Sequence, residues 1–242
     1  MSASARPIGW DILFGEHSGS DSSMVFSAVI HALLPQTEVV VDVGCGRGGT
    51  VQHLDGTDPL DFRGQGRHVI GIDVDPVGTE HPALNEFRLI ENERWPLEDN
   101  SVDLAVSDWT LEHVTAPEVF VRELARTLRP GGVIVARTVN RNSVTAWGAR
   151  MVPNRHHARV VGRMQPGRRE EDVFPTAYRM NNRKALAALL DREFEWSVTS
   201  HGGLHHYMQP WPRMARVARV AEQRFPEGNR LTLLLCARKR AR

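Results

Sequence analysis

Short apolar runs alternate with helix-like patterns along the first part of the chain. β-branched and aliphatic runs predict buried strands at 38–43, 68–73, 86–90, 102–107 and 133–138. Apolar residues at helical spacing predict helices at 24–34, 49–54 and 117–128. Strands that alternate with helices at this interval require parallel crossovers. We therefore expect an α/β fold with a doubly wound, mostly parallel sheet and helices on both faces.

The pattern changes after residue 140. Basic, helix-like stretches near 143–151 and 156–164 lead into a polar loop, so we interpret residues 141–180 as an inserted helical cap. The pattern beyond it predicts a helix at 181–190, a strand at 194–202, a helix at 214–225 and a last strand at 230–238, which brings the sheet to seven strands. No repeat or low-complexity linker divides the chain. We expect a single domain over 1–242, which consists of an N-terminal helix within 1–36, a core at 37–140, the cap, and the rest of the sheet at 181–242.

Composition narrows the class of protein. The 242 residues are 41% hydrophobic, which is enough to bury a full core. No apolar run reaches the roughly 18 residues of a membrane-spanning helix, and the first residues lack a basic stretch followed by an apolar one. Cys45 and Cys236 are too few for a disulfide framework and lack zinc-site spacing. These features predict a cytoplasmic protein that does not insert into membranes.

The near-neutral net charge of +1 hides an uneven distribution. Residues 1–140 hold 10 Arg and Lys against 21 Asp and Glu, whereas residues 141–242 hold 20 against 8. A basic half can attract an anionic substrate, a carrier domain or nucleic acid. Solvated surface arginine is the commoner cause of such a bias.

The loop GCGRGG at 44–49 follows the first strand directly. Gly44, Gly46 and Gly49 match the GxGxxG pattern of adenosyl-cofactor sites, although such a turn can also merely connect a strand to a helix. Asp73 ends the second strand, where a carboxylate can accept hydrogen bonds from both ribose hydroxyls. Asp42 precedes the glycines, and an acid there suits an ammonium group better than a pyrophosphate. The pattern favours a cofactor that carries an amino acid over NAD.

Four motifs in order contain these residues. They are VVVDVGCGRGG at 39–49, VIGIDVDP at 69–76, ENERWPLEDNSVDLAVSDWTLEHV at 91–114 and RELARTLRPGGVIVART at 122–138. Together they resemble the class I S-adenosylmethionine-dependent methyltransferases, especially the small-molecule type 11 group, over about residues 38–138. The resemblance implies a Rossmann-like fold, a cofactor-binding core at 37–140, S-adenosyl-L-methionine as cofactor and S-adenosyl-L-homocysteine as its product.

The resemblance also implies a role for individual residues of the motifs. Asp42 would orient the methionine ammonium, Asp73 would hold the ribose and Val74 would flank the adenine. The other positions that the family uses for cofactor binding are Gly44, Gly46, Glu91, Asn92, Asp108 and Trp109. Glu91 stands where the family usually has Asp, and Trp109 could equally pack against a helix.

An oxygen acceptor must also lose a proton, and histidine is the natural base near neutral pH. His113 in TLEHV is the first candidate, and a structural, hydrogen-bonded histidine is the alternative. Further polar candidates lie in segments expected to cover the carboxyl edge of the sheet: His156, His157, Glu170, Glu171, Asp172, Tyr178, Arg179, His201, His205, His206 and Tyr207. Asp172, Tyr178 and Arg179 lie in EEDVFPTAYR, which is similar to a stretch in bacterial relatives; a salt-bridged loop is the alternative. We expect no metal site, because the adjacent His205 and His206 lack a partner at ligand spacing.

The aromatic start of the chain, with Trp10, Phe14 and His17, would form a lid over the cofactor or simply be buried. We expect a methyltransferase that transfers the methyl group directly, by in-line displacement, to an oxygen, nitrogen or carbon of a small molecule. The acceptor would be a sugar-containing or secondary metabolite, and the basic second half of the chain would suit an anionic one. An RNA methyltransferase and a non-catalytic cofactor-binding protein of the same fold are the alternatives. No RNA-binding module is recognisable, and no residue pattern requires a homodimer.

Overall fold

The computed structural model describes residues 22–48, 63, 67–143, 175–203, 211–222 and 224–241. They form a seven-stranded sheet in the order β3-β2-β1-β4-β5-β7-β6. The strands are β1 (Val39–Val43), β2 (His68–Asp73), β3 (Glu86–Leu89), β4 (Val102–Asp108), β5 (Leu128–Val139), β6 (Phe194–His201) and β7 (Thr232–Lys239). All neighbours pair in parallel except β7, which is antiparallel to both β5 and β6. The predicted mostly parallel sheet is confirmed.

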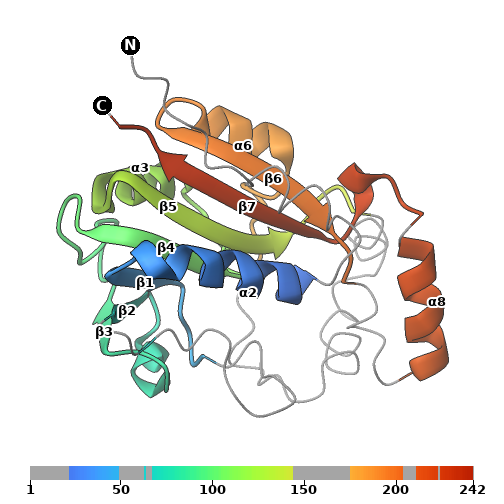
Figure 1. Ribbon diagram of the computed structural model, residues 1–242, viewed down its shortest axis with the longest axis horizontal. Helices are drawn as coiled ribbons and strands as arrows, with labels where there is room; N and C mark the ends of the chain where they lie inside the picture. Colours follow the sequence, from blue (N-terminus) through green and yellow to red (C-terminus); the bar gives the residue numbers. More distant parts are fainter. Residues whose placement is uncertain are drawn as a thin grey trace.

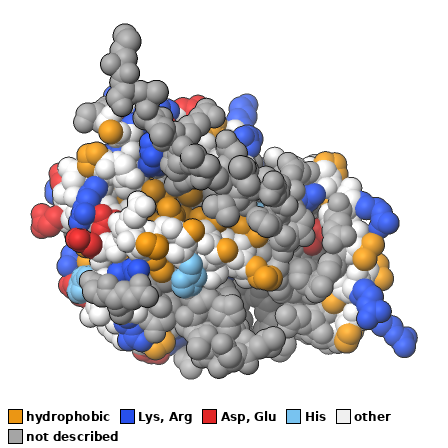
Figure 2. Space-filling view, viewed as in Figure 1, with side chains coloured by type: hydrophobic (Ala, Val, Ile, Leu, Met, Phe, Trp, Pro, Cys, Tyr) orange, Lys and Arg blue, Asp and Glu red, His pale blue; other side chains and the backbone are white. Residues whose placement is uncertain are grey.

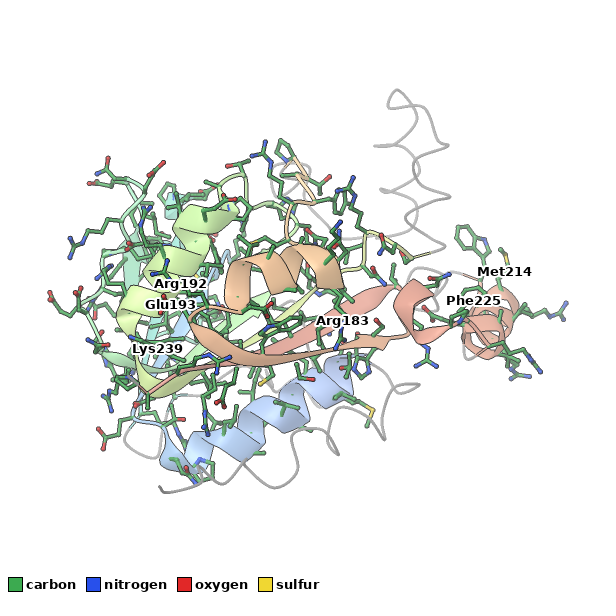
Figure 3. All side chains as sticks on the ribbon, turned by 90° about the horizontal axis from the view of Figure 1, so that it is seen from above. Arg183, Arg192, Glu193, Met214, Phe225 and Lys239 are labelled. Atoms are coloured by element: carbon green, nitrogen blue, oxygen red, sulfur yellow. The ribbon has the colours of Figure 1, made fainter. Side chains whose placement is uncertain are left out.

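Helices cover both faces of the sheet, as the continuous apolar strands require. On one face lies α2 (Ser22–Leu33), where Phe26 and Ile30 join a buried cluster with residues of the sheet such as Val135. The opposite face packs against α3 (Pro117–Thr127) and α6 (Arg183–Leu190) in a second cluster. The ribbon shows α2 crossing the front of the strands, and the view from above separates it from α6 by the sheet (Figure 1, Figure 3).

Shorter elements complete the described chain. They are the 3-10 turns η1 (Leu34–Gln36), η2 (Pro76–Glu80) and η4 (Glu227–Asn229), and the helix α8 (Pro212–Glu222). α8 stands at one end of the molecule, where apolar and basic side chains lie on the surface (Figure 2); Met214 is 54% exposed and Val217 68% exposed. Among the described residues, no helix combines the length and apolar character needed to cross a membrane.

The fifth strand begins earlier than its pattern predicts. β5 starts at Leu128 rather than at 133, so the Pro-Gly-Gly sequence lies inside the strand. A bulge accommodates it, because the register between β4 and β5 shifts between Val102 and Leu104. Gly131 adopts φ +81°, a conformation that glycine reaches without steric cost. The turn residues end α3 as predicted, but β5 begins before them and includes them.

Several predicted segments lie outside the described residues. They include the helix at 49–54, most of the cap, and the N-terminal segment with Trp10, Phe14 and His17. The other predicted strands and helices are present, and apart from the start of β5 their boundaries are displaced by up to three residues.

Candidate active site

The strand order reverses direction at β1. β2 and β3 follow on one side of it, and β4 and β5 lie on the other. In open parallel sheets, ligands bind in the crevice outside the carboxyl ends of the strands at such a switch point. Asp42, Asp73 and Asp108 lie at or next to the carboxyl ends of β1, β2 and β4. The structure thus brings together three acids that the sequence places far apart.

The glycine loop begins where β1 ends. The Gly44 amide donates a 2.8 Å hydrogen bond to the Ile72 carbonyl, which ties the loop to β2. Gly44, at φ +73°, passes so close to Thr110 that a Cβ would lie 2.3 Å from the threonine methyl carbon. For Gly46, at φ +49°, no atom of the described residues lies within 4 Å of the position of a Cβ. Its backbone is therefore open to a ligand, whereas Gly44 is needed for packing within the fold.

Asp73 connects the second strand to the glycine loop. Its Oδ2 accepts a 2.8 Å hydrogen bond from the Gly46 amide, and its Oδ1 accepts one of 2.9 Å from the Asp75 amide. A carboxylate has about four acceptor positions, so two backbone donors leave capacity for two hydroxyl hydrogens. The neighbouring Val74 is 68% exposed, which leaves an apolar surface beside this carboxylate. Both observations fit an adenosyl group at this edge.

Glu91 and Asn92 follow β3 at the same edge of the sheet. Both residues are exposed. The Ile90 amide donates a 2.7 Å hydrogen bond to the Asp73 carbonyl, so the chain that leads into Glu91 is fixed against the end of β2. The assignment of Glu91 and Asn92 to the adenine edge stays a prediction.

The carboxylate of Asp108 is held by a buried arginine. Arg137 on β5 donates from Nε to Oδ1 over 2.6 Å and from Nη2 to Oδ2 over 2.7 Å. The guanidinium lies between the rings of Phe26 and Trp109, 5.0 Å and 4.9 Å from their centroids, and Arg137 is 1% exposed. Trp109, at φ +54°, therefore packs against an arginine rather than only against a helix. This bidentate pair compensates the charge of Asp108; the roles of Asp108 and Trp109 toward the cofactor stay predictions.

Asp42 has a different electrostatic environment. Burial raises the pKa of the Asp42 carboxyl, the nearby His81 opposes this increase, and Asp108 and Asp73 add to it. Its side chain is 17% exposed, and His81 Nε2 lies 3.6 Å from its Oδ2. Within the described residues, no Lys or Arg forms an ion pair with Asp42. An ammonium group would find here a carboxylate whose charge is not yet compensated.

A second group of predicted residues meets beside the end of β4. The Ala177 and Tyr178 amides donate to the Glu112 carbonyl over 2.7 and 3.1 Å. Arg179 Nη1 donates to the Thr115 carbonyl over 2.6 Å. Hydrogen bonds to the carbonyls of Glu112 and Thr115 thus hold Tyr178 and Arg179 beside the loop that carries His113.

The hydrogen bond of His113 defines its tautomer. Its Nδ1 lies 2.9 Å from the Pro175 carbonyl oxygen. Because a carbonyl can only accept, Nδ1 must carry the hydrogen, and the lone pair of the neutral ring is on Nε2. The ring therefore makes the structural hydrogen bond that we considered as the alternative.

The sequence did not predict a buried series of hydrogen-bonded polar side chains next to His113. Thr138 Oγ1 donates to Glu112 Oε2 over 2.6 Å, and Asn181 Nδ2 donates to Thr138 Oγ1 over the same distance. Burial raises the pKa of the Glu112 carboxyl. The signal in the sequence was the acid within TLEHV, Glu112. Its partners lie on β5 and in the segment before α6, and no local sequence pattern connects these segments to it.

Comparison with known proteins bears on this geometry. Residues 41–136 match the family model described as a methyltransferase domain, Methyltransf_11. The chain carries a class I S-adenosylmethionine-dependent methyltransferase domain. The matched residues include the glycine loop, Asp42, Asp73 and Asp108, so the cofactor of this family is the ligand to test against the site.

Curated relatives match the methyltransferase domain over part of their length. A protein of Mycolicibacterium smegmatis, named as a probable S-adenosylmethionine-dependent methyltransferase, is 35% identical over 42% of this chain and 38% of its own. A malonyl-[acyl-carrier protein] O-methyltransferase of Yersinia pestis is 29% identical over 46% of this chain and 40% of its own. The chain thus spans less than half the length of these relatives.

Solved structures share the fold over nearly the whole chain. A methyltransferase of Thermotoga maritima covers 95% of this chain and 92% of its own, with TM-score 0.54 and 18% identity. A geranyl diphosphate C-methyltransferase of Streptomyces coelicolor, solved with S-adenosyl-L-homocysteine, covers 98% of this chain and 86% of its own, with TM-score 0.53 and 15% identity. At these identities the likeness shows the fold alone.

The remaining predicted residues of the methyltransferase domain fall in two groups. His201 ends β6 at the same edge of the sheet, with its Nε2 2.8 Å from Thr199 Oγ1. The others lie outside the described residues: Gly49, His156, His157, Glu170, Glu171, Asp172, His205, His206 and Tyr207. In the described part of the chain, no three His, Cys, Asp or Glu side chains are grouped to hold a metal ion.

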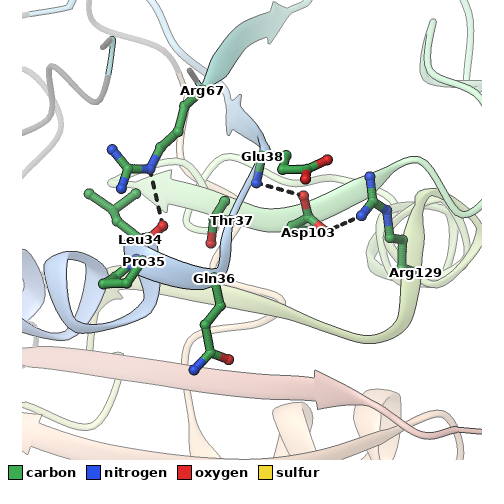
Figure 4. Close-up of a pocket in the computed structure, with 8 residues that line it drawn as sticks. All are labelled: Leu34, Pro35, Gln36, Thr37, Glu38, Arg67, Asp103 and Arg129. Carbon is green, nitrogen blue, oxygen red and sulfur yellow. Dashed lines mark hydrogen bonds and ion pairs between the residues drawn. The ribbon is translucent and has the colours of Figure 1, made fainter. Parts of the chain in front are cut away.

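A hollow of about 530 Å³ lies at the opposite edge of the sheet, between η1 and the amino ends of β1 and β4 (Figure 4). Asp103 links the walls of this hollow. Its Oδ1 lies 2.6 Å from Arg129 Nη1, and its Oδ2 accepts from the Glu38 and Val39 amides over 2.9 and 2.8 Å. These polar groups already stabilise the fold, and they lie far from the switch point. We therefore do not assign the reaction to this hollow.

Proposed function

We propose that the methyltransferase domain transfers a methyl group from S-adenosylmethionine to a small-molecule acceptor held beside His113. The observation that carries the proposal is that the three acids at the switch point have different partners. Arg137 compensates Asp108, backbone amides hold Asp73, and Asp42 keeps a charge without a Lys or Arg partner in the described chain. This distribution fits a ligand with ribose hydroxyls at one end and an ammonium at the other.

Each part of that cofactor has a residue to hold it. Asp73 would accept the ribose hydroxyls, Asp42 would bind the methionine ammonium, and the exposed Val74 would contact the adenine. When bound, S-adenosylmethionine supplies a methyl group that its sulfonium has already activated. The protein must then mainly align the acceptor atom, and in-line displacement needs no covalent intermediate.

His113 is the candidate base for an oxygen acceptor. Its Nδ1 hydrogen bond to Pro175 fixes the ring orientation, and Nε2 carries the lone pair that can take a hydroxyl proton. Tyr178 and the exposed Arg179 lie on the segment attached to the same loop, where Arg179 would suit an anionic acceptor. The O-methyltransferase names of two partial relatives, from Yersinia pestis and Neisseria meningitidis, favour oxygen as the acceptor atom.

Calorimetric titration tests the cofactor assignment. We expect saturable binding of S-adenosyl-L-homocysteine and none of NAD. Asp73→Asn should weaken that binding about tenfold or more, because a charge-assisted hydrogen bond contributes roughly 1.5–3 kcal/mol. Glu195→Gln is the matched control, since Glu195 is an acid at the start of β6, on the edge far from the site. Binding of NAD, or of neither ligand, would overturn the assignment.

A mass-shift screen with methyl-deuterated cofactor tests transfer. The acceptor set should include phenols, sugar-containing metabolites, carboxylic acids and, as the competing class, RNA. His113→Asn keeps a donor toward the Pro175 carbonyl and removes the basic nitrogen, so kcat for a hydroxyl acceptor should fall about 100-fold or more. Its binding of S-adenosyl-L-homocysteine should stay unchanged. Cofactor binding without transfer to any class would favour a non-catalytic protein.

A further inference from the structure

His81 lies directly beneath the glycine loop. It follows η2, and its backbone amide donates to the Gly78 carbonyl over 3.2 Å. The side chain is 4% exposed. A Cβ on Gly48 would lie 2.7 Å from His81 Nε2 and less than 3 Å from two further ring atoms, so the ring packs against the bare glycine backbone. Gly48, at φ +73°, therefore both turns the loop and leaves room for this ring.

A backbone contact fixes the tautomer of His81. The Ala83 amide donates a 3.1 Å hydrogen bond to Nδ1, so that nitrogen must carry the lone pair. The hydrogen of the neutral ring is then on Nε2, which lies 3.6 Å from Asp42 Oδ2. This distance exceeds that of a hydrogen bond, but a small shift of the carboxylate would form one. Even without that shift, the positive end of the N–H dipole lies beside the carboxylate.

Asp42 depends on this contact more than an exposed acid would. Its side chain is mostly buried, and Asp73 and Asp108 both disfavour its ionised form. Arg137 forms its ion pair with Asp108, whereas among the described residues His81 is the basic side chain next to Asp42. We propose that His81 is a positioning residue that holds the Asp42 carboxylate in the orientation that binds the cofactor's ammonium group. This inference rests on the proposed function.

Two ligands separate this role from a merely structural one. S-adenosyl-L-homocysteine carries the ammonium group, whereas 5′-methylthioadenosine has the same adenosyl thioether without the amino-acid end. His81→Ala should weaken binding of S-adenosyl-L-homocysteine about tenfold, as expected for one contact to a charged group. Binding of 5′-methylthioadenosine should change less than twofold. His81→Gln places an amide N–H near the position of Nε2–H and should restore part of the affinity for S-adenosyl-L-homocysteine.

A double-mutant cycle with Asp42 tests the mechanism. In an Asp42→Asn background the carboxylate is gone, so adding His81→Ala should cost less than twofold in S-adenosyl-L-homocysteine affinity. His68→Ala is the control, because His68 is a half-exposed histidine at the opposite end of β2, paired with Glu86. It should leave the affinity for both ligands unchanged.

The outcomes distinguish the inference from the function on which it rests. If the wild-type protein does not bind S-adenosyl-L-homocysteine, the proposed function itself is wrong. If it binds, but His81→Ala affects neither ligand or weakens both equally, His81 does not position Asp42 and the inference is wrong. If His81→Ala does not fold, His81→Leu replaces it, because leucine fills the space beneath the glycine loop without an N–H donor. An unchanged ratio of the two affinities in His81→Leu overturns the inference.

Discussion

At the scale of single residues, Asp42 should reduce the stability of the protein without ligand. Burial raises the pKa of its carboxyl, so the folded state binds the proton more tightly than the unfolded state does. At neutral pH the ionised carboxylate therefore lowers the free energy of unfolding, and this cost disappears as the pH falls below the raised pKa. We expect Asp42→Asn to stabilise the ligand-free protein by roughly 1 kcal/mol, or about 2–4 °C in Tm, at pH 7.5.

Thermal unfolding at pH 7.5 and at pH 5 checks this prediction. The advantage of Asp42→Asn should be smaller at pH 5, where more of the wild-type carboxyl is protonated. Glu195→Gln serves as the control, because Glu195 is half-exposed and lies far from the site. A lower Tm for Asp42→Asn at pH 7.5 would mean that contacts of the carboxylate outweigh the cost of burying it. Stability and cofactor binding would then not oppose each other at this position.

At the same scale, the sequence predicted residue types better than residue partners. The positions of Asp42 and Asp73 at strand ends follow from the apolar runs before them, and the structure brings them together as expected. The partners of these acids come from other strands and loops. His81 lies eight residues beyond β2 in a turn-rich segment, and only the path of η2 brings it beneath the glycine loop. Pattern analysis has no signal for such a contact.

At the scale of elements, Arg137 links α2 to β4 and β5. Its guanidinium pairs with Asp108, lies against Phe26 and donates from Nη1 to Ser23 Oγ over 2.5 Å. Arg137→Met should destabilise the protein by about 3–5 kcal/mol, because it leaves the Asp108 carboxylate buried without a partner. Asp108→Leu combined with Arg137→Met should recover much of this loss, since no uncompensated charge remains.

Urea unfolding of the two variants and the wild type measures these free energies. The Ser23→Ala variant gives the scale of a single hydrogen bond, and we expect a loss of about 1 kcal/mol there. If the double variant were as unstable as Arg137→Met, the contacts of the guanidinium with the rings of Phe26 and Trp109 would be the main contribution. The prediction that charge compensation dominates would then be wrong.

Element boundaries show which local signals can be trusted. Asn182 precedes α6, and its side chain accepts a 2.9 Å hydrogen bond from the Ala185 amide, so it is the N-cap of this helix. The apolar spacing alone predicts a start at 181. The Pro-Gly-Gly sequence after α3 was a correct end signal for the helix but not a start signal for β5. Bulges depend on the neighbouring strand, so a pattern read along one strand cannot locate them.

At the scale of the whole molecule, the order and alternation of the elements predicted the sheet, and the candidate site lies at its carboxyl edge. Parallel crossovers force the carboxyl ends of β1, β2 and β4 to one side, so the location of the site follows from topology. The charge difference between the two halves of the chain did not locate any feature of the site. Pairs such as Arg137 with Asp108 cross strands, and they set the local electrostatics regardless of the net charge of either half.

Because the site joins several strands of one sheet, cofactor binding should stabilise the domain as a unit. Gly44 bonds to β2, Asp73 holds Gly46, and Arg137 connects β5 to β4 at the same edge. At a free S-adenosyl-L-homocysteine concentration one hundred times its Kd, the free energy of unfolding should rise by about 2.7 kcal/mol. For a domain of this size, the increase in Tm should be about 5–10 °C. Calorimetry should show a single transition that moves as a whole. For Asp73→Asn, a tenfold higher Kd should reduce the stabilisation to about 1.4 kcal/mol at the same ligand concentration. Two transitions, of which only one responds to the ligand, would show that the glycine loop and the β5–β7–β6 half of the sheet unfold independently.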